Sequence, residues 1–266
     1  MSRPVFFLDS AAELSAGESC VLDGAEGHHA AVVRRIRVGE QVVLTDGRGT
    51  ALEAEITVVG HGDAVCAVLA ARHEERSPLQ VTVVQAIPKG DRGELAVDLL
   101  TEVGVDLIVP WQAERCVSRW KGEKVGKGRV KWASVAREAA KQSRRTWWPD
   151  VAPVADLDAV VELIAGADVA WVLHEAATDP LTWLLAGGAL PGSGQVVLVV
   201  GPEGGVSDAE LDALVAAGAS AVRLGPTVLR TSTAGVVAAT LLLAGTDAWG
   251  RSLSEEDEGS ADDRGR

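Results

Sequence analysis

Residues 195–210 read QVVLVVGPEGGVSDAE, and this stretch decides the fold. The apolar, mostly β-branched run from Gln195 to Val200 predicts a strand that is buried on both faces of a parallel sheet. Gly201-Pro202-Glu203-Gly204-Gly205 predicts a sharp turn, because glycine adopts backbone conformations that other residues avoid. Ser207 and Glu210 have the spacing of a capping box that opens a helix. Ligands of open α/β sheets bind where such strands end, so we expect a binding site here.

A second loop of the same kind follows a predicted strand at 221–224. The segment from Gly225 to Arg230 leads into a helix predicted from Thr231 to Gly245, with Thr231 or Ser232 as its cap. Dipeptides of glycine and proline also form ordinary turns, so either loop alone is weak evidence for a site. Two neighbouring strand ends with glycines and backbone amides, together with Arg230, favour a single ligand site.

The composition is that of a globular protein. The 266 residues are 47% hydrophobic and 24% charged, which suits one large domain or two modest ones. No apolar run is long enough to span a bilayer and no signal peptide is recognisable, so we expect a cytoplasmic protein. Cys20, Cys66 and Cys116 form no CxxC pair and the histidines have no metal-ligand spacing, so neither a disulfide framework nor a metal site is predicted.

Charge is unevenly distributed along the chain. The formal net charge of -13 argues against a protein that coats nucleic acid through bulk positive charge. Between Glu114 and Arg145, however, eleven lysines and arginines stand against three glutamates, which predicts a phosphate-binding surface. Residues 252–266 contain six acids and no apolar periodicity, which predicts a disordered acidic tail.

Residues 1–74 predict a β-rich domain, a small barrel or barrel-like sheet. The strand candidates are 5–8, 19–22, 41–45, 50–59 and 63–69, with one short helix from His28 to Ile36. Asp46-Gly47-Arg48-Gly49 resembles the glycine loop of Rossmann-type methyltransferases. A strand follows it instead of a helix, so a hairpin turn is the better interpretation.

A polar segment that ends in Pro78 marks the boundary to a second domain, residues 79–247. Strands and helices alternate there, which predicts a mostly parallel α/β sheet. Further strands are expected at 81–87, 106–109 and 169–173, and further helices at 91–103, 128–145 and 207–217. The helix that begins at Thr231 carries no charge, so it must be covered on most sides. A second subunit and a central place in one large core explain this equally well.

The common dinucleotide, nucleoside triphosphatase, zinc-protease and serine-hydrolase motifs are absent. Most of the eight tryptophans are expected in the core or an interface. Trp120, Trp147 and Trp148 lie within or beside the basic run, where a nucleic-acid base could stack on them.

Several short motifs occur together in one order. They are Lys89-Gly90-Asp91-Arg92, Thr101-Glu102-Val103-Gly104-Val105, Glu114-Arg115-Cys116, Gln142-Ser143, the loop from Gly201 to Gly205, Leu224-Gly225 and Val228-Leu229-Arg230-Thr231. The chain resembles the RsmE family, the small-subunit ribosomal RNA (uracil-N3) methyltransferases of the SPOUT superfamily. His28-His29, Arg34-Arg35-Ile36-Arg37 and Asp46 to Gly49 match the PUA-like RNA-binding barrel of that family. The resemblance covers about Arg3 to Ala244.

The resemblance implies an N-terminal PUA-like β-barrel followed by a SPOUT α/β domain with a C-terminal trefoil knot. It implies S-adenosylmethionine bound in the knot, a homodimer joined through the last helix, and methylation of uracil N3 in 16S ribosomal RNA on the small ribosomal subunit. The residues expected to line the cofactor pocket are Leu173, Gly201, Glu203, Gly204, Gly205, Leu224, Gly225, Leu229 and Arg230. This cofactor carries no phosphate, so it needs no phosphate-binding loop.

Methyl transfer to N3 requires loss of a proton and stabilisation of the resulting negative charge. Arg230 is the first candidate to hold that charge and Arg92 the second. The candidate bases are Glu102, Glu138 and Glu175, and water could also serve. A plain helical pairing with Lys141 or Gln142 is the strong alternative for Glu138.

RNA contacts are expected from two groups of residues, Arg34, Arg35 and Arg37 on the barrel and Arg137, Lys141, Gln142 and Arg144 on the basic helix. Spacings of four and three place Arg137, Lys141 and Arg144 on one helical face, although a merely solvated face is a fair alternative. Ser232 stands where many members of the family have glutamate, so an acid there is not essential. The segment 141–145 is more basic than the family pattern, which favours Gln142 as the base-reading amide.

Two other functions remain open on the sequence alone. One is a SPOUT methyltransferase that acts on a ribose 2′-hydroxyl of tRNA or rRNA. The other is a non-catalytic RNA-binding or ribosome-assembly protein, which would not bind S-adenosylmethionine.

Overall fold

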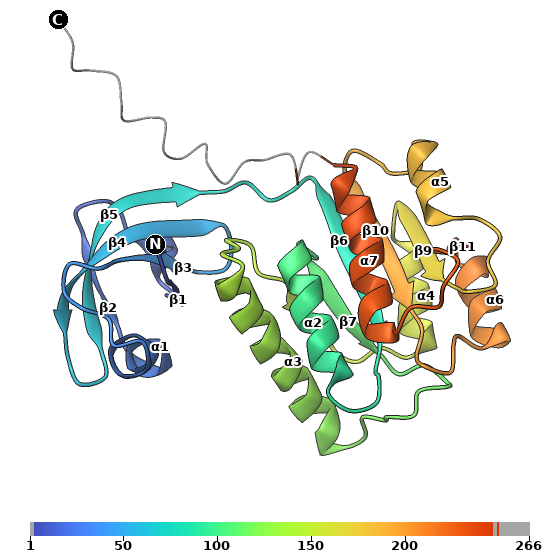
Figure 1. The fold of residues 1–266 in the computed structure, drawn as a ribbon, viewed down its shortest axis with the longest axis horizontal. Coiled ribbons are helices and arrows are strands. Elements are labelled where there is room, and N and C mark those ends of the chain that lie inside the picture. Colours follow the sequence, from blue (N-terminus) through green and yellow to red (C-terminus); the bar gives the residue numbers. More distant parts are fainter. Residues whose placement is uncertain (1–2, 247–248, 250–266) are drawn as a thin grey trace, which may run out of the picture.

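The computed structural model describes residues 3–246 and 249, and the predicted acidic tail at 252–266 lies outside them. The described part consists of a β-rich first unit and an α/β second unit (Figure 1). None of the described helices combines the length and apolar character of a membrane span.

The first unit is built on one five-stranded sheet with the order β1-β3-β4-β5-β2. Its strands are β1 (Val5–Phe7), β2 (Ser19–Leu22), β3 (Gln41–Thr45), β4 (Thr50–Val59) and β5 (Ala64–His73). A short 3-10 helix, η1 (Ala11–Glu13), precedes β2, and α1 (Gly24–His28) continues into a π-helical turn, η2 (His29–Val33). β1 pairs with β3 in parallel and the other neighbours are antiparallel, so the sheet is mixed.

Two predictions for this unit need correction and one is confirmed. The helix begins at Gly24, not at His28, and it ends before Arg35, whose φ of 53° is left-handed and stops a right-handed helix. β5 extends to His73 because its pairing with β4 continues to Thr50. β3 and β4 pair as antiparallel neighbours across the turn at 46–49, which confirms the hairpin.

The second unit is built on six parallel strands with the order β11-β9-β10-β6-β7-β8. They are β6 (Leu79–Ala86), β7 (Leu107–Trp111), β8 (Asp150–Val151), β9 (Val169–Leu173), β10 (Gly194–Val200) and β11 (Ser220–Val222). β10 is the strand predicted from Gln195 to Val200, and its side chains alternate between two cores: Leu198 joins the core on one face, and Val197 and Val199 join the core on the other. The prediction of a strand buried on both faces is therefore confirmed.

Helices cover both faces of this sheet (Figure 1). Side chains of α2 (Arg92–Val103), α3 (Glu123–Gln142), α5 (Leu181–Ala186) and α7 (Thr231–Ala244) share one core, and those of α4 (Leu157–Ala165) and α6 (Asp208–Ala216) share the other. Helices α4 and α5 and strand β8 have no counterpart among the predicted elements, and α3 begins at Glu123 instead of the predicted Gly128. Gly128 lies inside α3, where the Trp120 ring packs closely against the helix backbone. A Cβ at this position would be 2.6 Å from the indole ring.

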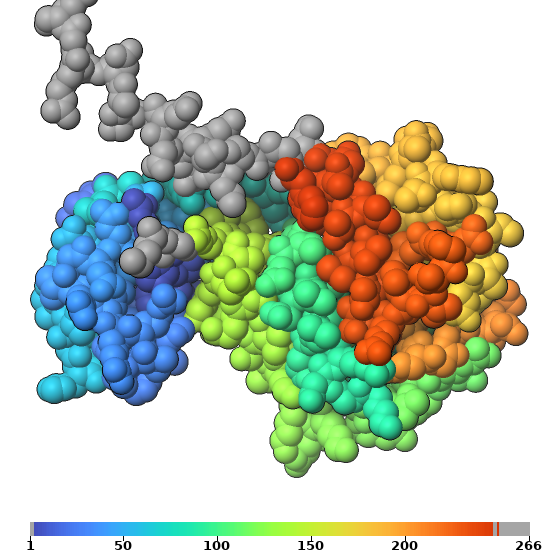
Figure 2. Space-filling view, in the orientation of Figure 1, coloured from blue at the N-terminus to red at the C-terminus, as the bar shows by residue number. Residues whose placement is uncertain are grey.

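The two units meet at the β3–β4 turn and the residues that follow α3. The Gly49 amide donates to the Thr146 carbonyl at 3.0 Å, and the Trp148 amide donates to the Gly47 carbonyl at 2.9 Å. A Cβ at Gly47 would lie 2.6 Å from the Trp148 ring, so only glycine fits there. Figure 2 shows the blue first unit packed against the yellow-green end of α3.

Candidate functional site

A cavity of about 610 Å³ lies at the carboxyl ends of β9, β10 and β11. The loop 200–208 after β10 forms one wall and the loop 222–231 after β11 forms another. Leu173, His174 and Glu175, at the end of β9, close it from the side. The capped helix α6 fixes one end of the first loop, and α7 fixes one end of the second.

Every residue predicted to line a cofactor pocket also lines this cavity: Leu173, Gly201, Glu203, Gly204, Gly205, Leu224, Gly225, Leu229 and Arg230, and Arg92 lines it too. Parallel strands bring their carboxyl ends to one edge of the sheet, which is why residues from three distant segments converge. The cavity also contains residues outside the predicted set, among them Arg115, His174, Asp208 and Thr231.

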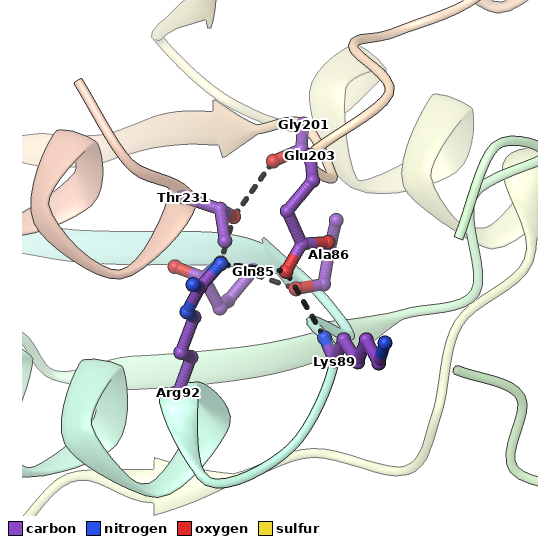
Figure 3. Close-up of polar contacts among 7 residues, drawn as sticks. All are labelled: Gln85, Ala86, Lys89, Arg92, Gly201, Glu203 and Thr231. Atoms are coloured by element: carbon purple, nitrogen blue, oxygen red, sulfur yellow. Dashed lines mark hydrogen bonds and ion pairs between the residues drawn. The ribbon is translucent and has the colours of Figure 1, made fainter. Parts of the chain in front are cut away.

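A chain of buried hydrogen bonds joins the two loops (Figure 3). The Gln85 side-chain amide donates to the Thr231 hydroxyl at 3.0 Å, and this hydroxyl donates to the Gly201 carbonyl at 2.7 Å. Gln85 also donates to the Ala86 carbonyl at 3.1 Å. The end of β6, the start of α7 and the glycine loop are thereby held together. Gln85 is absent from the predicted site, although a lone amide at the carboxyl end of an apolar buried strand is a usable signal.

Glu203, within the loop after β10, contacts the turn before α2 (Figure 3). Its Oε1 accepts a hydrogen bond from the Lys89 amide at 3.1 Å and lies 3.5 Å from the Arg92 guanidinium. The carboxylate therefore connects the β10 loop with the turn before α2. Arg92 and Glu203 also line a second hollow of about 720 Å³, together with Lys89, Gly90, Asp91, Leu95 and Val117. The two cavities thus share a charged wall.

Glu210 ties the start of α6 to the segment after β7. Its Oε1 accepts from the Glu114 amide at 2.7 Å, while its Oε2 accepts from the Ser207 amide at 3.0 Å and completes the predicted capping box. The next residue, Arg115, donates to the carbonyls of Gly204 and Val206. These contacts attach the glycine loop and the start of α6 to the segment that follows β7.

Arg230 is the residue just before α7. Its backbone carbonyl accepts from the amides of Thr233 and Ala234 at 2.8 and 2.9 Å, so the helix fixes the position of its Cα. The side chain is exposed and lines the cavity, and it makes no hydrogen bond or ion pair within residues 3–246. The guanidinium is thus available to a ligand.

Only one of the three candidate bases lies at the cavity. Glu175 lines it, whereas Glu102 is exposed at the end of α2 and Glu138 pairs with Lys141 at 3.1 Å. The alternative interpretation of Glu138 as a helical partner of Lys141 is therefore the correct one.

The residues predicted to contact RNA lie away from the cavity. Arg34, Arg35 and Arg37 are exposed in the segment that follows η2, and Gln142 and Arg144 are exposed at and just after the end of α3. The Arg137 guanidinium lies over the rings of Phe7 and Trp148, 5.0 and 5.9 Å from their centroids. Trp147 and Trp148 are part of the junction between the units, whereas Trp120 packs edge-on against Trp132.

Lys141 requires a correction. Its side chain is only 7% exposed, and its ammonium pairs with Glu26 at 2.9 Å and with Glu138. Arg144 lies beyond the end of α3 with a φ of 58°, so helical spacing does not place it beside Arg137. Arg137, Lys141 and Arg144 therefore do not form one exposed face.

Within the described residues, no cluster of histidine, cysteine and carboxylate side chains has the arrangement of a metal site.

Comparison with known proteins gives the same two-part division. The model of an RNA methyltransferase domain matches residues 75–243, and that of an RNA methyltransferase PUA domain matches residues 22–69. The chain is 46% identical to the ribosomal RNA small subunit methyltransferase E of Mycobacterium bovis over 96% of this chain and 97% of the relative. The protein of that name from Bacillus subtilis is 30% identical over 80% of this chain and 85% of the relative.

The fold agrees with the same relationship. A crystal structure of ribosomal RNA small subunit methyltransferase E from Neisseria gonorrhoeae, bound to S-adenosylmethionine, superposes with a TM-score of 0.79 at 29% identity. The superposition covers 91% of this chain and 98% of that one. The chain therefore belongs to the RsmE family, the family of ribosomal RNA small subunit methyltransferase E.

Proposed function

We propose that this protein transfers a methyl group from S-adenosylmethionine to N3 of one uracil in 16S ribosomal RNA. The observation that carries the proposal is the cavity at the strand ends, where two glycine loops meet and Arg230 and Arg92 line the walls. Family membership supports the reaction class, because the named relatives are ribosomal RNA methyltransferases. The substrate is the small ribosomal subunit in the cytoplasm.

The cavity suits S-adenosylmethionine in size and chemistry. Its volume lies within the roughly 300–1,000 Å³ that is usual for small-molecule sites. Leu173, Leu224 and Leu229 provide apolar walls for an adenine ring, and the carboxylate of Asp208 suits a positively charged amino group. When bound, the cofactor supplies a methyl group on a positively charged sulfur.

In the reaction, side chains of this protein hold the deprotonated base and neutralise its negative charge. Arg230 places in the cavity a guanidinium that has no hydrogen-bond acceptor among the described residues, and there it can stabilise charge on the uracil oxygens. Arg92 provides a second cation, oriented by Glu203 at the wall between the two cavities. Glu175 is the carboxylate placed to accept the N3 proton, directly or through water.

We place a nucleotide that adjoins the target uracil in the second hollow, because the uracil itself must reach Arg230 and Glu175 in the first cavity. Leu95 and Val117 line it with side chains that are 47% and 68% exposed, which suits an unstacked base. Lys89 and Arg92 add positive charge for the adjoining phosphates. This position lies across the Arg92–Glu203 pair from the cofactor cavity.

The larger RNA surface lies at the junction of the two units. The Glu26–Lys141 ion pair joins α1, which leads to Arg34, Arg35 and Arg37, to the end of α3, where Gln142 and Arg144 are exposed. Replacing Arg34, Arg35 and Arg37 by alanine should weaken binding to the small subunit. The slope of the logarithm of the binding constant against the logarithm of the salt concentration should become shallower by about one for each phosphate contact that is lost. Filter binding over a salt series measures this, and an unchanged affinity and slope would contradict the assignment.

The finer architecture is also proposed. We assign the first unit to a PUA-like barrel and the end of the second to a trefoil knot that threads through the loop after β10. The attachment of Thr231 to Gly201 and the central place of β10 support the knot. The partly exposed Val237 and Leu241 support a homodimer through α7, a helix that lies at the surface of the described part (Figure 2). Sedimentation equilibrium of wild type and Val237→Glu tests the dimer, and a monomeric wild type would reject it.

The decisive experiment uses small subunits from cells that lack this activity. They are incubated with purified protein and labelled S-adenosylmethionine, and the digested nucleosides are identified by mass spectrometry. We expect 3-methyluridine. A ribose 2′-O-methylated nucleoside would reject the base specificity, and no transfer together with no calorimetric cofactor binding would reject catalysis.

Arg230→Ala tests the central residue. We expect a loss of turnover of about 100-fold or more, because one charge-stabilising donor is removed from the transition state. The helix should persist because its cap is the backbone carbonyl of residue 230, and circular dichroism checks this. Arg230→Lys should recover part of the activity, because it restores the charge without the forked geometry. Near-wild-type turnover of Arg230→Ala would remove this residue from the mechanism.

A further inference from the structure

Cys20 and Cys66 are neighbours across two antiparallel strands of the first unit. β2 and β5 pair in a register that sets Cys20 directly opposite Cys66. Opposite residues of antiparallel strands point to the same face with their Cα atoms about 4.5–5.5 Å apart, within the range of about 4.4–6.8 Å that a disulfide spans. Cys66 is fully buried in the core of this unit, and Cys20 packs partly buried against the same core.

The two thiols differ in burial and in the direction in which the pKa is shifted. A hydrogen bond from the Cys66 thiol lowers the pKa of Cys20, although burial opposes the shift, and the same contact together with burial raises the pKa of Cys66. β2 is an outer strand of the sheet, and Cys20 is partly exposed, whereas Cys66 is fully buried. A partly exposed thiol with a lowered pKa beside a second, buried thiol is the arrangement of an attacking and a resolving cysteine.

We propose that Cys20 and Cys66 form a thiol–disulfide exchange site that reacts with low-molecular-weight disulfides of the glutathione class. The Cys20 thiolate attacks one sulfur of the small disulfide, forms a mixed disulfide and releases one small thiolate. Cys66 then loses its proton, attacks the Cys20 sulfur and releases the second small thiolate. The two protein protons end on the released thiolates, so two protein thiols are oxidised and one small disulfide is reduced to two thiols.

The product would fasten the outer strand β2 to β5. β2 leads directly to α1, which holds the Glu26–Lys141 contact with the second unit. The bond would therefore restrain α1, which makes one of the contacts between the two units. The site lies outside both cavities and does not depend on the proposed methyl transfer.

The test treats the full-length folded protein with oxidised glutathione and follows intact mass. We expect a loss of two hydrogen atoms in wild type, a Cys20–Cys66 peptide after non-reducing digestion, and a higher melting temperature that returns to its original value with reductant. The Cys116→Ser variant is the matched control and should behave like wild type, because Cys116 is a separate buried thiol in the second unit.

Single variants separate the two roles. Cys66→Ala should stop at the mixed disulfide and carry one glutathione on residue 20, whereas Cys20→Ala should remain unmodified. Circular dichroism shows that each variant is folded. A wild-type protein that keeps three free thiols, a crosslink that contains Cys116, or equal glutathione attachment to Cys66 in Cys20→Ala would overturn the proposal.

Discussion

At the scale of single residues, the Thr231 hydroxyl is the contact that joins the two loops of the cavity. It accepts from Gln85 and donates to the Gly201 carbonyl. Thr231→Val keeps the shape but leaves both partners without this bond, which should lower the free energy of unfolding by about 1–3 kcal/mol and raise the KM for S-adenosylmethionine. Urea unfolding and initial rates measure the two effects. Thr233→Val, two residues along α7, is the matched control because its hydroxyl makes no hydrogen bond within residues 3–246; equal effects of both variants would contradict the role of Thr231.

A second residue sets a pH dependence of stability. Burial raises the pKa of the Asp106 carboxyl, although the Val81 amide and the Arg145 guanidinium oppose the shift. From about pH 3.9, the ordinary carboxyl pKa, up to the raised value, the folded state binds more protons than the unfolded chain, so stability falls as pH rises. Asp106→Asn does not titrate and keeps an acceptor for the Val81 amide, which donates to Asp106 at 2.8 Å.

We therefore expect the unfolding free energy of wild type to fall relative to that of Asp106→Asn as pH rises through this window. Urea titrations at several pH values measure the difference. A difference that stays constant, or that rises with pH, would contradict the raised pKa.

At the scale of elements, the start of α6 depends on the buried Glu210 carboxylate. This carboxylate accepts from the backbone amides of Ser207 and Glu114 with its two oxygens. Glu210→Gln replaces one acceptor oxygen by a donor, which leaves one amide unpaired and should lower the unfolding free energy by about 1–3 kcal/mol. Asp212→Asn makes the same chemical change at an exposed position of α6 and should shift it by less than about 0.5 kcal/mol. Equal denaturation midpoints for the two variants would show that the hydrogen bond between Glu210 and the Glu114 amide does not contribute to the free energy of unfolding.

At the scale of the whole molecule, Lys141 is the buried cation between the units. Lys141→Met leaves the carboxylates of Glu26 and Glu138 without this partner, and losing one partner of a buried pair should lower the unfolding free energy by about 3 kcal/mol. A double-mutant cycle with Glu26→Gln isolates the coupling across the junction. Lys127→Met is the control, because its pair with Glu123 has side chains that are 77% and 85% exposed, and it should change stability by less than about 1 kcal/mol. A coupling near zero would show that this ion pair does not join the units.

Much of the second unit could be predicted because local patterns and tertiary burial agree there. The run from Gln195 to Val200 is apolar enough for only one environment, a strand covered on both faces, and the Ser207–Glu210 spacing satisfies the exposed amides at a helix start locally. α4 was not predicted even though Asp156 accepts from the Ala159 amide and caps it. β8 is only two residues long, and a strand that short has no periodicity to detect.

Local patterns in the sequence predict the strands, glycine loops and capped helices around the cavity, and the family whose motifs they carry. These depend on propensity, capping and spacing, which act over a few residues. Only the tertiary structure decided that Gln85 bonds Thr231 from 146 positions away, and that Lys141 points into a buried junction instead of toward RNA. The position of Lys141 in the sequence of α3 is the same whether its side chain is exposed or buried, so helical spacing alone does not distinguish the two. The difference arises from Glu26, which lies 115 positions away in the sequence and reaches Lys141 only when the two units pack together.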